Sequence, residues 1–157
     1  MCPEFPMPQA VRLTRVFDAP VELVYRAWTE AEHVVKWMKC DADATLEVEN
    51  WVPEVGVEFE TYMVQPGVFE ARGKGRFTAV EPPHLLEYVQ YADPKLGVPE
   101  MTVRVELQER DGGTALTLTH TGIPSHFCGM IDGGWTSSLS QLESVLANLT
   151  VPSEASP

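Results

Sequence analysis

The spacing of hydrophobic residues changes between two periods along the chain, one typical of strands and one typical of helices. Apolar and polar residues alternate over Val11–Phe17, which predicts a strand, and helical spacing follows over Val21–Met38. Over Thr45–His120 the period is two again. Helical spacing returns at about Ser125 or later and continues to Leu149. The pattern therefore predicts one strand, two short helices, a run of further strands and one long final helix.

The early helical part begins with a start signal. Asp18 is a suitable N-cap residue, and Pro20 fits the first turn of a helix. A break near Glu30 separates this helix from a second one, expected over Ala31–Met38. The apolar face of the first helix consists of Val21, Val24, Tyr25 and Trp28.

The middle part predicts six strands joined by short connections. Asp111, Gly112 and Gly113 mark a hairpin turn. Gly73 and Gly75 lie on the inward face of the longest strand, where they either leave room beneath the final helix or let the strand bend. The strands are expected over Thr45–Glu49, Glu58–Met63, Phe69–Ala79, Leu86–Gln90, Val103–Gln108 and Leu116–His120.

Short connections favour an antiparallel, meandering sheet. Such a sheet has one apolar face to cover, and the final helix is the only predicted element long enough to cover it. The predicted fold class is therefore α+β, with a twisted antiparallel sheet around a long C-terminal helix and two short helices after the first strand. The 157 residues suit one domain, expected over residues 10–150, with a flexible arm at 1–9 and a disordered tail at 151–157.

The charge of the chain restricts its partners. The chain has 11 Lys and Arg residues and 23 Asp and Glu residues, which give a formal net charge of −12. A surface of that sign repels phosphate backbones and anionic lipid headgroups, so we expect neither nucleic acid nor a membrane as a partner. No apolar run approaches the roughly 20 residues of a membrane helix, and the first residues do not resemble a secretory signal.

Cysteine usage and motif content point to a protein without metal or cofactor. The three cysteines, Cys2, Cys40 and Cys128, form no CxxC pair, which predicts free thiols and a cytoplasmic protein. No histidines pair at metal-ligand spacing, and no nucleotide-binding motif occurs. Ser125 and His126 are neighbours on the chain, but neighbouring side chains rarely face each other. We therefore predict no catalytic residue, no metal and no cofactor.

His120 is the single residue with the most chemical interest. By alternation it shares the inward face with Leu116 and Leu118. A buried imidazole needs a hydrogen-bond partner. Two interpretations stay open: a histidine at the rim of the sheet that is bonded to solvent or a carbonyl, or a polar group that orients a ligand or moves a proton.

Many aromatic residues fall on inward-facing positions. Ordinary core packing explains these positions, and so does an apolar cavity with a few placed polar groups. The candidate polar groups are Thr61, Tyr88, Gln90 and His120. The full set of predicted cavity-lining residues is Trp37, Phe59, Thr61, Met63, Phe77, Tyr88, Gln90, Val105, Leu118, His120, Trp135 and Leu139.

Several short motifs occur in an order that is typical of one family. They are Phe17-Asp18-Ala19-Pro20, Val24–Glu30 with Trp37, Gly75-Arg76-Phe77 ahead of Pro82-Pro83, Gly113–His120, and Gly134-Trp135 ahead of Leu139 and Leu142. With these motifs the chain, from about Val11 to Leu149, resembles the activator of heat-shock-protein-90 ATPase homologue family of the START-like (SRPBCC, birch-pollen-allergen-like) superfamily. One departure is Gly56-Val57, where the family usually has two glycines.

The resemblance implies a helix-grip fold with a cavity between the sheet and the final helix. Members often bind apolar small molecules, some related proteins are cyclases or hydrolases, and the eukaryotic namesake is a co-chaperone. We therefore expect binding of an apolar or aromatic small molecule in that cavity, without catalysis. The alternatives are a co-chaperone-like module that contacts a chaperone or another protein, and a cyclase- or hydrolase-like enzyme that uses His120. Monomer and homodimer both stay open.

Overall fold

The elements follow one another in the predicted order. The structure is a computed structural model that describes residues 9–95 and 97–150, so the predicted tail and all of the predicted arm except Gln9 lie outside the described residues. The elements are β1 (Gln9–Phe17), α1 (Val21–Thr29), α2 (Ala31–Trp37), β2 (Thr45–Glu49), β3 (Glu58–Gln65), β4 (Phe69–Glu81), β5 (Leu85–Gln90), β6 (Met101–Arg110), β7 (Gly113–Ile123), the 3-10 turn η1 (Ser125–Phe127) and α3 (Cys128–Thr150).

The strands form one sheet of seven strands in the order β1-β7-β6-β5-β4-β3-β2. Every neighbouring pair is antiparallel, as predicted. The hairpin between β6 and β7 turns at Asp111 and Gly112, whose φ angles are 49° and 82°. Positive φ at both central residues is the requirement of a tight two-residue hairpin turn, so the predicted turn is confirmed.

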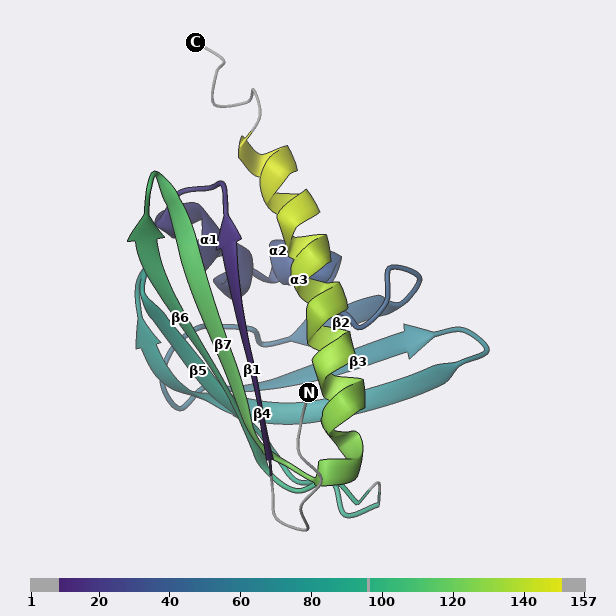
Figure 1. The fold of residues 1–157 in the computed structure, drawn as a ribbon. Coiled ribbons are helices and arrows are strands. Elements are labelled where there is room, and N and C mark those ends of the chain that lie inside the picture. Colours follow the sequence, from purple (N-terminus) through teal and green to yellow (C-terminus); the bar gives the residue numbers. More distant parts are fainter. Residues whose placement is uncertain (1–8, 96, 151–157) are drawn as a thin grey trace.

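The long helix α3 lies across one face of the sheet (Figure 1). Its 23 residues span about 35 Å at the usual rise per residue. Leu139 and Leu142 of this helix are fully buried against the rest of the core. The pair β3 and β4 reaches past α3 on the side away from β1 (Figure 1). The predicted α+β fold class is therefore confirmed, with a sheet that extends further than its covering helix.

The start of α1 differs from the prediction. Pro20 occupies the N-cap position, and no side chain caps the helix. The carbonyl oxygen of Pro20 accepts hydrogen bonds from the amides of Leu23 and Val24. The prediction that Asp18 is the N-cap is wrong, because a bend at Asp18 and Ala19 and the extended residue Pro20 precede the helix.

Two groups of aromatic side chains contribute the largest rings to the main hydrophobic core. The aromatic cluster (Trp51, Phe59, Phe77 and Tyr88) has ring centroids 4.7 to 6.1 Å apart. In the tryptophan cluster (Trp28, Trp37 and Trp135), Trp28 lies 4.6 Å from Trp37 and 5.8 Å from Trp135. Aromatic pairs at these separations add to the stabilisation that burial provides.

Gly75 lets its neighbours in the sheet approach closely. A side-chain carbon at this position would lie 2.1 Å from the carbonyl oxygen of Val89 and 2.8 Å from the ring of Phe59. The space that the missing side chain leaves is therefore taken by Phe59. The room that an inward glycine was expected to leave is therefore absent at Gly75, where close approach of Val89 and Phe59 requires glycine.

Candidate functional site

The twelve predicted cavity-lining residues come from seven elements, which are α2, the strands β3 to β7, and α3. Nine of them are buried, and Thr61, Met63 and Gln90 are half-buried. Trp37 comes from α2, Trp135 and Leu139 come from α3, and the rest lie on strands β3 to β7. Most of the nine buried residues belong to a single packed hydrophobic cluster, so side chains occupy this part of the interior.

His120 forms a buried pair with Trp135. The indole nitrogen Nε1 of Trp135 donates a hydrogen bond to Nδ1 of His120 at 2.9 Å, and His120 is only 4% exposed. Since an indole N–H can only donate, Nδ1 is the acceptor and the neutral ring carries its hydrogen on Nε2. Burial lowers the pKa of His120 to about 4, so the ring is neutral at pH 7.

The other ring nitrogen of His120 has no partner. Among residues 9–95 and 97–150, no group forms a hydrogen bond with Nε2 of His120. His120 is therefore not a rim residue bonded to solvent or to a carbonyl, which was one of the two interpretations of the sequence. Nothing in the spacing of the sequence indicated that Trp135 is its partner, because the two residues are 15 positions apart on different elements.

Tyr88 is a second polar group on the same face. Register places Tyr88 beside Val103 and Val103 beside His120, so the three residues form one row across β5, β6 and β7. The Tyr88 hydroxyl donates to Sδ of Met38 at 3.8 Å, and a thioether sulfur is a weak acceptor. Burial raises the pKa of Tyr88. The row therefore presents two uncharged polar groups inside a largely apolar interior.

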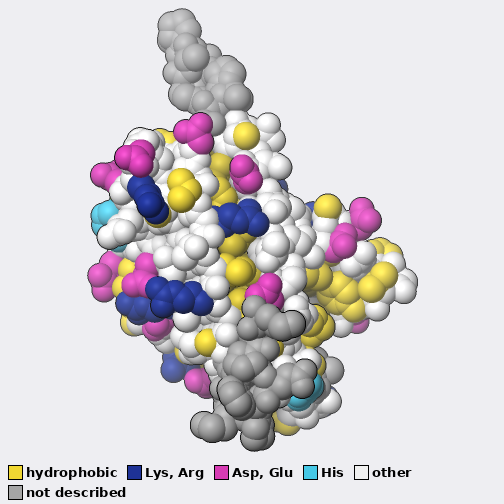
Figure 2. Space-filling view, viewed as in Figure 1, with side chains coloured by type: hydrophobic (Ala, Val, Ile, Leu, Met, Phe, Trp, Pro, Cys, Tyr) yellow, Lys and Arg dark blue, Asp and Glu magenta, His cyan; other side chains and the backbone are white. Residues whose placement is uncertain are grey.

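An apolar strip continues this inner face beyond α3. It consists of Met63, Phe69 and Ala71, which share the face of β3 and β4 that carries buried Phe59. Met63 and Phe69 are half-buried and Ala71 is exposed. Figure 2 shows hydrophobic side chains gathered over the projecting end of β3 and β4. The strip therefore connects the buried aromatic cluster with water.

Two adjoining hollows lie on the opposite face of the same strands. Their volumes are about 500 and 380 Å³. Of the twelve predicted lining residues, only Thr61 and Phe59 contribute to them. We call the two together the outer hollow; its lining is Glu47, Glu49, Asn50, Glu58, Phe59, Glu60, Thr61, Tyr62, Arg72, Gly73, Lys74, Tyr91, Ala92 and Asp93.

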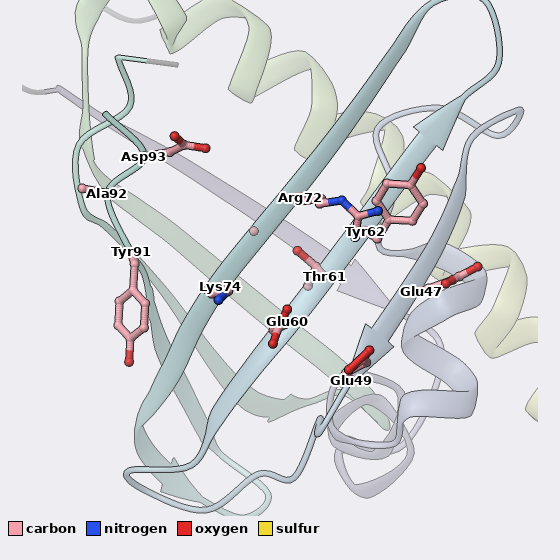
Figure 3. A pocket seen from close by; sticks show the side chains of 11 residues that line it. Glu47, Glu49, Glu60, Thr61, Tyr62, Arg72, Lys74, Tyr91, Ala92 and Asp93 are labelled. Carbon is pink, nitrogen blue, oxygen red and sulfur yellow. The ribbon is translucent and has the colours of Figure 1, made fainter. Parts of the chain in front are cut away.

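Charged side chains such as Lys74 and Glu60 lie between Tyr91 and Tyr62 in the outer hollow (Figure 3). The guanidinium of Arg72 lies 4.0 Å from the centre of the Tyr62 ring. The Tyr91 hydroxyl donates to Oε2 of Glu58 at 2.6 Å. The alternation in the sequence placed Glu58, Tyr62 and Arg72 on the outward face of their strands. The hollow also depends on the loop after β5, which begins at Tyr91 and whose position the pattern did not predict.

The two described cysteines, Cys40 and Cys128, differ in their chemical state. Cys40 is a free, exposed thiol whose pKa is raised by burial of its sulfur. Cys128 is disulfide-bonded, so the prediction of free thiols is wrong at this position. Cysteine usage therefore no longer argues for a reducing compartment.

Within the part of the chain that the structure describes, no three His, Cys, Asp or Glu side chains converge on a possible metal position. The same residues include no helix that combines the length and apolarity needed to span a membrane.

A long helix across a seven-stranded antiparallel sheet, with two short helices after the first strand, defines the helix-grip class of START-like domains. The family model described as "Activator of Hsp90 ATPase homolog 1-like protein" matches residues 18–147, so the chain belongs to this family. The resemblance of the sequence motifs is thus confirmed.

Solved structures share the fold over most of its length. A Chromobacterium violaceum protein is 26% identical, with a TM-score of 0.81, over 87% of this chain and 96% of that one. A Nitrosomonas europaea protein is 25% identical, with a TM-score of 0.75, over 91% and 97%. An Arthrobacter aurescens protein is 22% identical, with a TM-score of 0.76, over 94% and 91%. No curated protein matches the chain.

Proposed function

We propose that the protein binds an uncharged, largely apolar small molecule between α3 and the inner face of the sheet, with His120 as its polar contact. The observation that carries this proposal is the unpartnered Nε2–H of His120. A buried donor without an acceptor costs about 1–3 kcal/mol, and native proteins contain few of them. A carbonyl or ether oxygen of a ligand would satisfy this donor.

The environment of His120 favours a neutral ligand. The low pKa of His120 and the raised pKa of Tyr88 have the same cause, which is the loss of water around each side chain. A charged ligand would meet the same penalty without an opposite charge to offset it. The aromatic cluster and the tryptophan cluster offer flat apolar surfaces for the body of the ligand.

Entry of a ligand requires the start of α3 to move, because side chains occupy the interior. Gly129 and Gly133 lie in the first turns of α3, and a Cβ at either position would meet nothing within 4 Å. Packing therefore does not require glycine there, although each glycine lowers helix stability by about 1 kcal/mol. The two glycines therefore weaken the helix between Cys128, which is buried and disulfide-bonded, and Trp135.

The protonation of His120 supports binding more than catalysis. Nδ1 already accepts the hydrogen bond from Trp135, and Nε2 carries the hydrogen, so neither nitrogen offers a lone pair to a substrate. With a pKa of about 4, the ring holds no extra proton to donate at pH 7. Acid–base work by His120 would first need a different tautomer and a different partner.

The test is a pair of ligands that differ in one acceptor. We expect 2-acetylnaphthalene to bind more tightly than 2-ethylnaphthalene, by about tenfold for one satisfied buried donor, in titrations followed by tryptophan fluorescence. His120→Phe should abolish this preference, whereas His126→Phe, at an exposed position, should keep it. Failure of both compounds to bind, or the same preference in His120→Phe, would overturn the proposal.

A further inference from the structure

The outer hollow carries an excess of negative charge. Five carboxylates line it, from Glu47, Glu49, Glu58, Glu60 and Asp93, against two cationic side chains, Arg72 and Lys74. The excess has the same sign as the whole chain, whose net charge is −12. This part of the surface therefore attracts cations more strongly than its flat surroundings do, because low-dielectric walls focus the field in a concave site.

The carboxylates of the outer hollow lack cationic partners of their own. Within residues 9–95 and 97–150, ion pairs closer than 4.0 Å involve other glutamates and none of these five residues. Glu49 lies directly opposite Glu60 in the β2–β3 ladder. Like charges directly opposite each other on one face destabilise a sheet. A positive group bound between them would relieve this repulsion.

The cations of the outer hollow leave room for another positive group. Arg72 is already engaged with the ring of Tyr62 at 4.0 Å, which demonstrates that this surface accommodates a stacked guanidinium. Lys74 lies opposite Glu60 in the β3–β4 ladder, yet no ion pair joins them. Volumes of about 500 and 380 Å³ admit several side chains of a peptide.

From these observations we infer that the outer hollow docks a basic peptide segment of another protein. Charge complementarity selects this occupant: a second copy of the chain and a nucleic acid would each bring negative charge to an acidic surface. Arginine or lysine side chains of the segment lie between Glu49 and Glu60 and beside Tyr91. The inference is independent of the small-molecule proposal, since the two sites use opposite faces of β3 and β4.

The experiment measures binding of fluorescein-labelled 12-residue peptides by anisotropy at low and high salt. The panel contains peptides of Arg, Lys, Ser and Leu and matched peptides with Glu in place of the cations. We expect the basic peptides alone to bind, and to weaken with salt. The double variant Glu49→Gln/Glu60→Gln should lower their affinity by about tenfold.

A control distinguishes binding in the outer hollow from attraction by the overall negative charge of the protein. The double variant Glu22→Gln/Glu109→Gln removes the same amount of charge at exposed positions outside the hollow, and it should change the affinity by less than about twofold. Equal losses in the two double variants would show general electrostatic attraction and overturn the inference. So would the absence of binding for every basic peptide, or full competition by spermine, which would assign the hollow to small cations.

Discussion

The two faces of β3 and β4 are built from alternate residues of the same strands, yet they have opposite properties. On the inner face, Phe59 and Phe77 are almost fully buried in the aromatic cluster. On the outer face, Glu60 and Lys74 are exposed and lie opposite each other in the outer hollow. A shift of the register by one residue would exchange the two faces, so one set of hydrogen bonds determines both.

This comparison shows where the two proposed binding sites get their selectivity. The inner face has no charge and an unsatisfied donor, so an apolar molecule with an acceptor oxygen suits it. The outer face has unpaired carboxylates in water, where ion pairs are individually weak and depend on salt. Changes on the inner face should therefore alter stability, whereas changes on the outer face should alter charge-dependent binding.

The largest effect is expected from truncation of the aromatic cluster. Phe77→Ala should lower the free energy of unfolding by about 3–5 kcal/mol, because Phe77 is 0% exposed and contacts three other rings. Lys74→Ala on the outer face should stay within about 0.5 kcal/mol. Urea denaturation measures both. If Phe77→Ala does not fold, Phe77→Leu should still cost more than Lys74→Ala; equal costs would contradict the comparison.

The next largest effect is a dependence of stability on pH. The pKa of His120 is lowered to about 4 in the folded protein, from an ordinary value of 6.5. Between these values the unfolded chain binds more protons, so stability should fall as the pH drops from 6.5 toward 4, by up to about 3 kcal/mol.

The variant His120→Gln removes this titrating group. The difference between its free energy of unfolding and that of the unmodified protein should therefore change across pH 4 to 6.5 and stay constant above pH 7. Denaturant melts at each pH measure this difference. A constant difference across the whole range would mean that His120 is accessible to water.

A moderate effect is expected at the start of α3. Gly133→Ala should stabilise the protein by about 1 kcal/mol, because alanine favours a helix and its Cβ meets no other atom within 4 Å. If the first turns of α3 open for a ligand, the same variant should slow ligand association. Gly75→Ala is the matched control with the opposite expected effect. It should lower stability, because its Cβ would lie 2.1 Å from a carbonyl oxygen. Thermal melts and stopped-flow fluorescence measure these outcomes.

The smallest effect is expected from the like-charged pair on the outer face. Glu49→Gln should raise stability by a few tenths of a kcal/mol, roughly, because it removes the repulsion from Glu60 across the strands. The gain should shrink in high salt, which screens exposed charges. Glu109→Gln, away from the outer hollow, should show no such gain. A loss of stability in Glu49→Gln at low salt would contradict this account.

Periodicity was sufficient to predict the element order, the antiparallel sheet and the inward position of His120. The period of two separates the faces of a strand, and helical spacing identifies α3. The pairing of His120 with Trp135 was not predictable, because it depends on how α3 rotates over the sheet. The outer hollow was missed because alternation identifies outward residues without showing where a loop makes the surface concave. The N-cap was wrongly predicted at Asp18 because capping signals define the start of a helix only to within a few residues.

The stacking of Trp28 on Trp135 gives the protein an internal optical signal. Their ring centroids lie 5.8 Å apart with planes inclined by 26°, and Trp28 belongs to α1 whereas Trp135 belongs to α3. Indole transition dipoles at this separation couple, so near-ultraviolet circular dichroism should contain a contribution from the pair. Any displacement of the long helix would change that contribution before the backbone unfolds, which makes opening of the fold visible without a label.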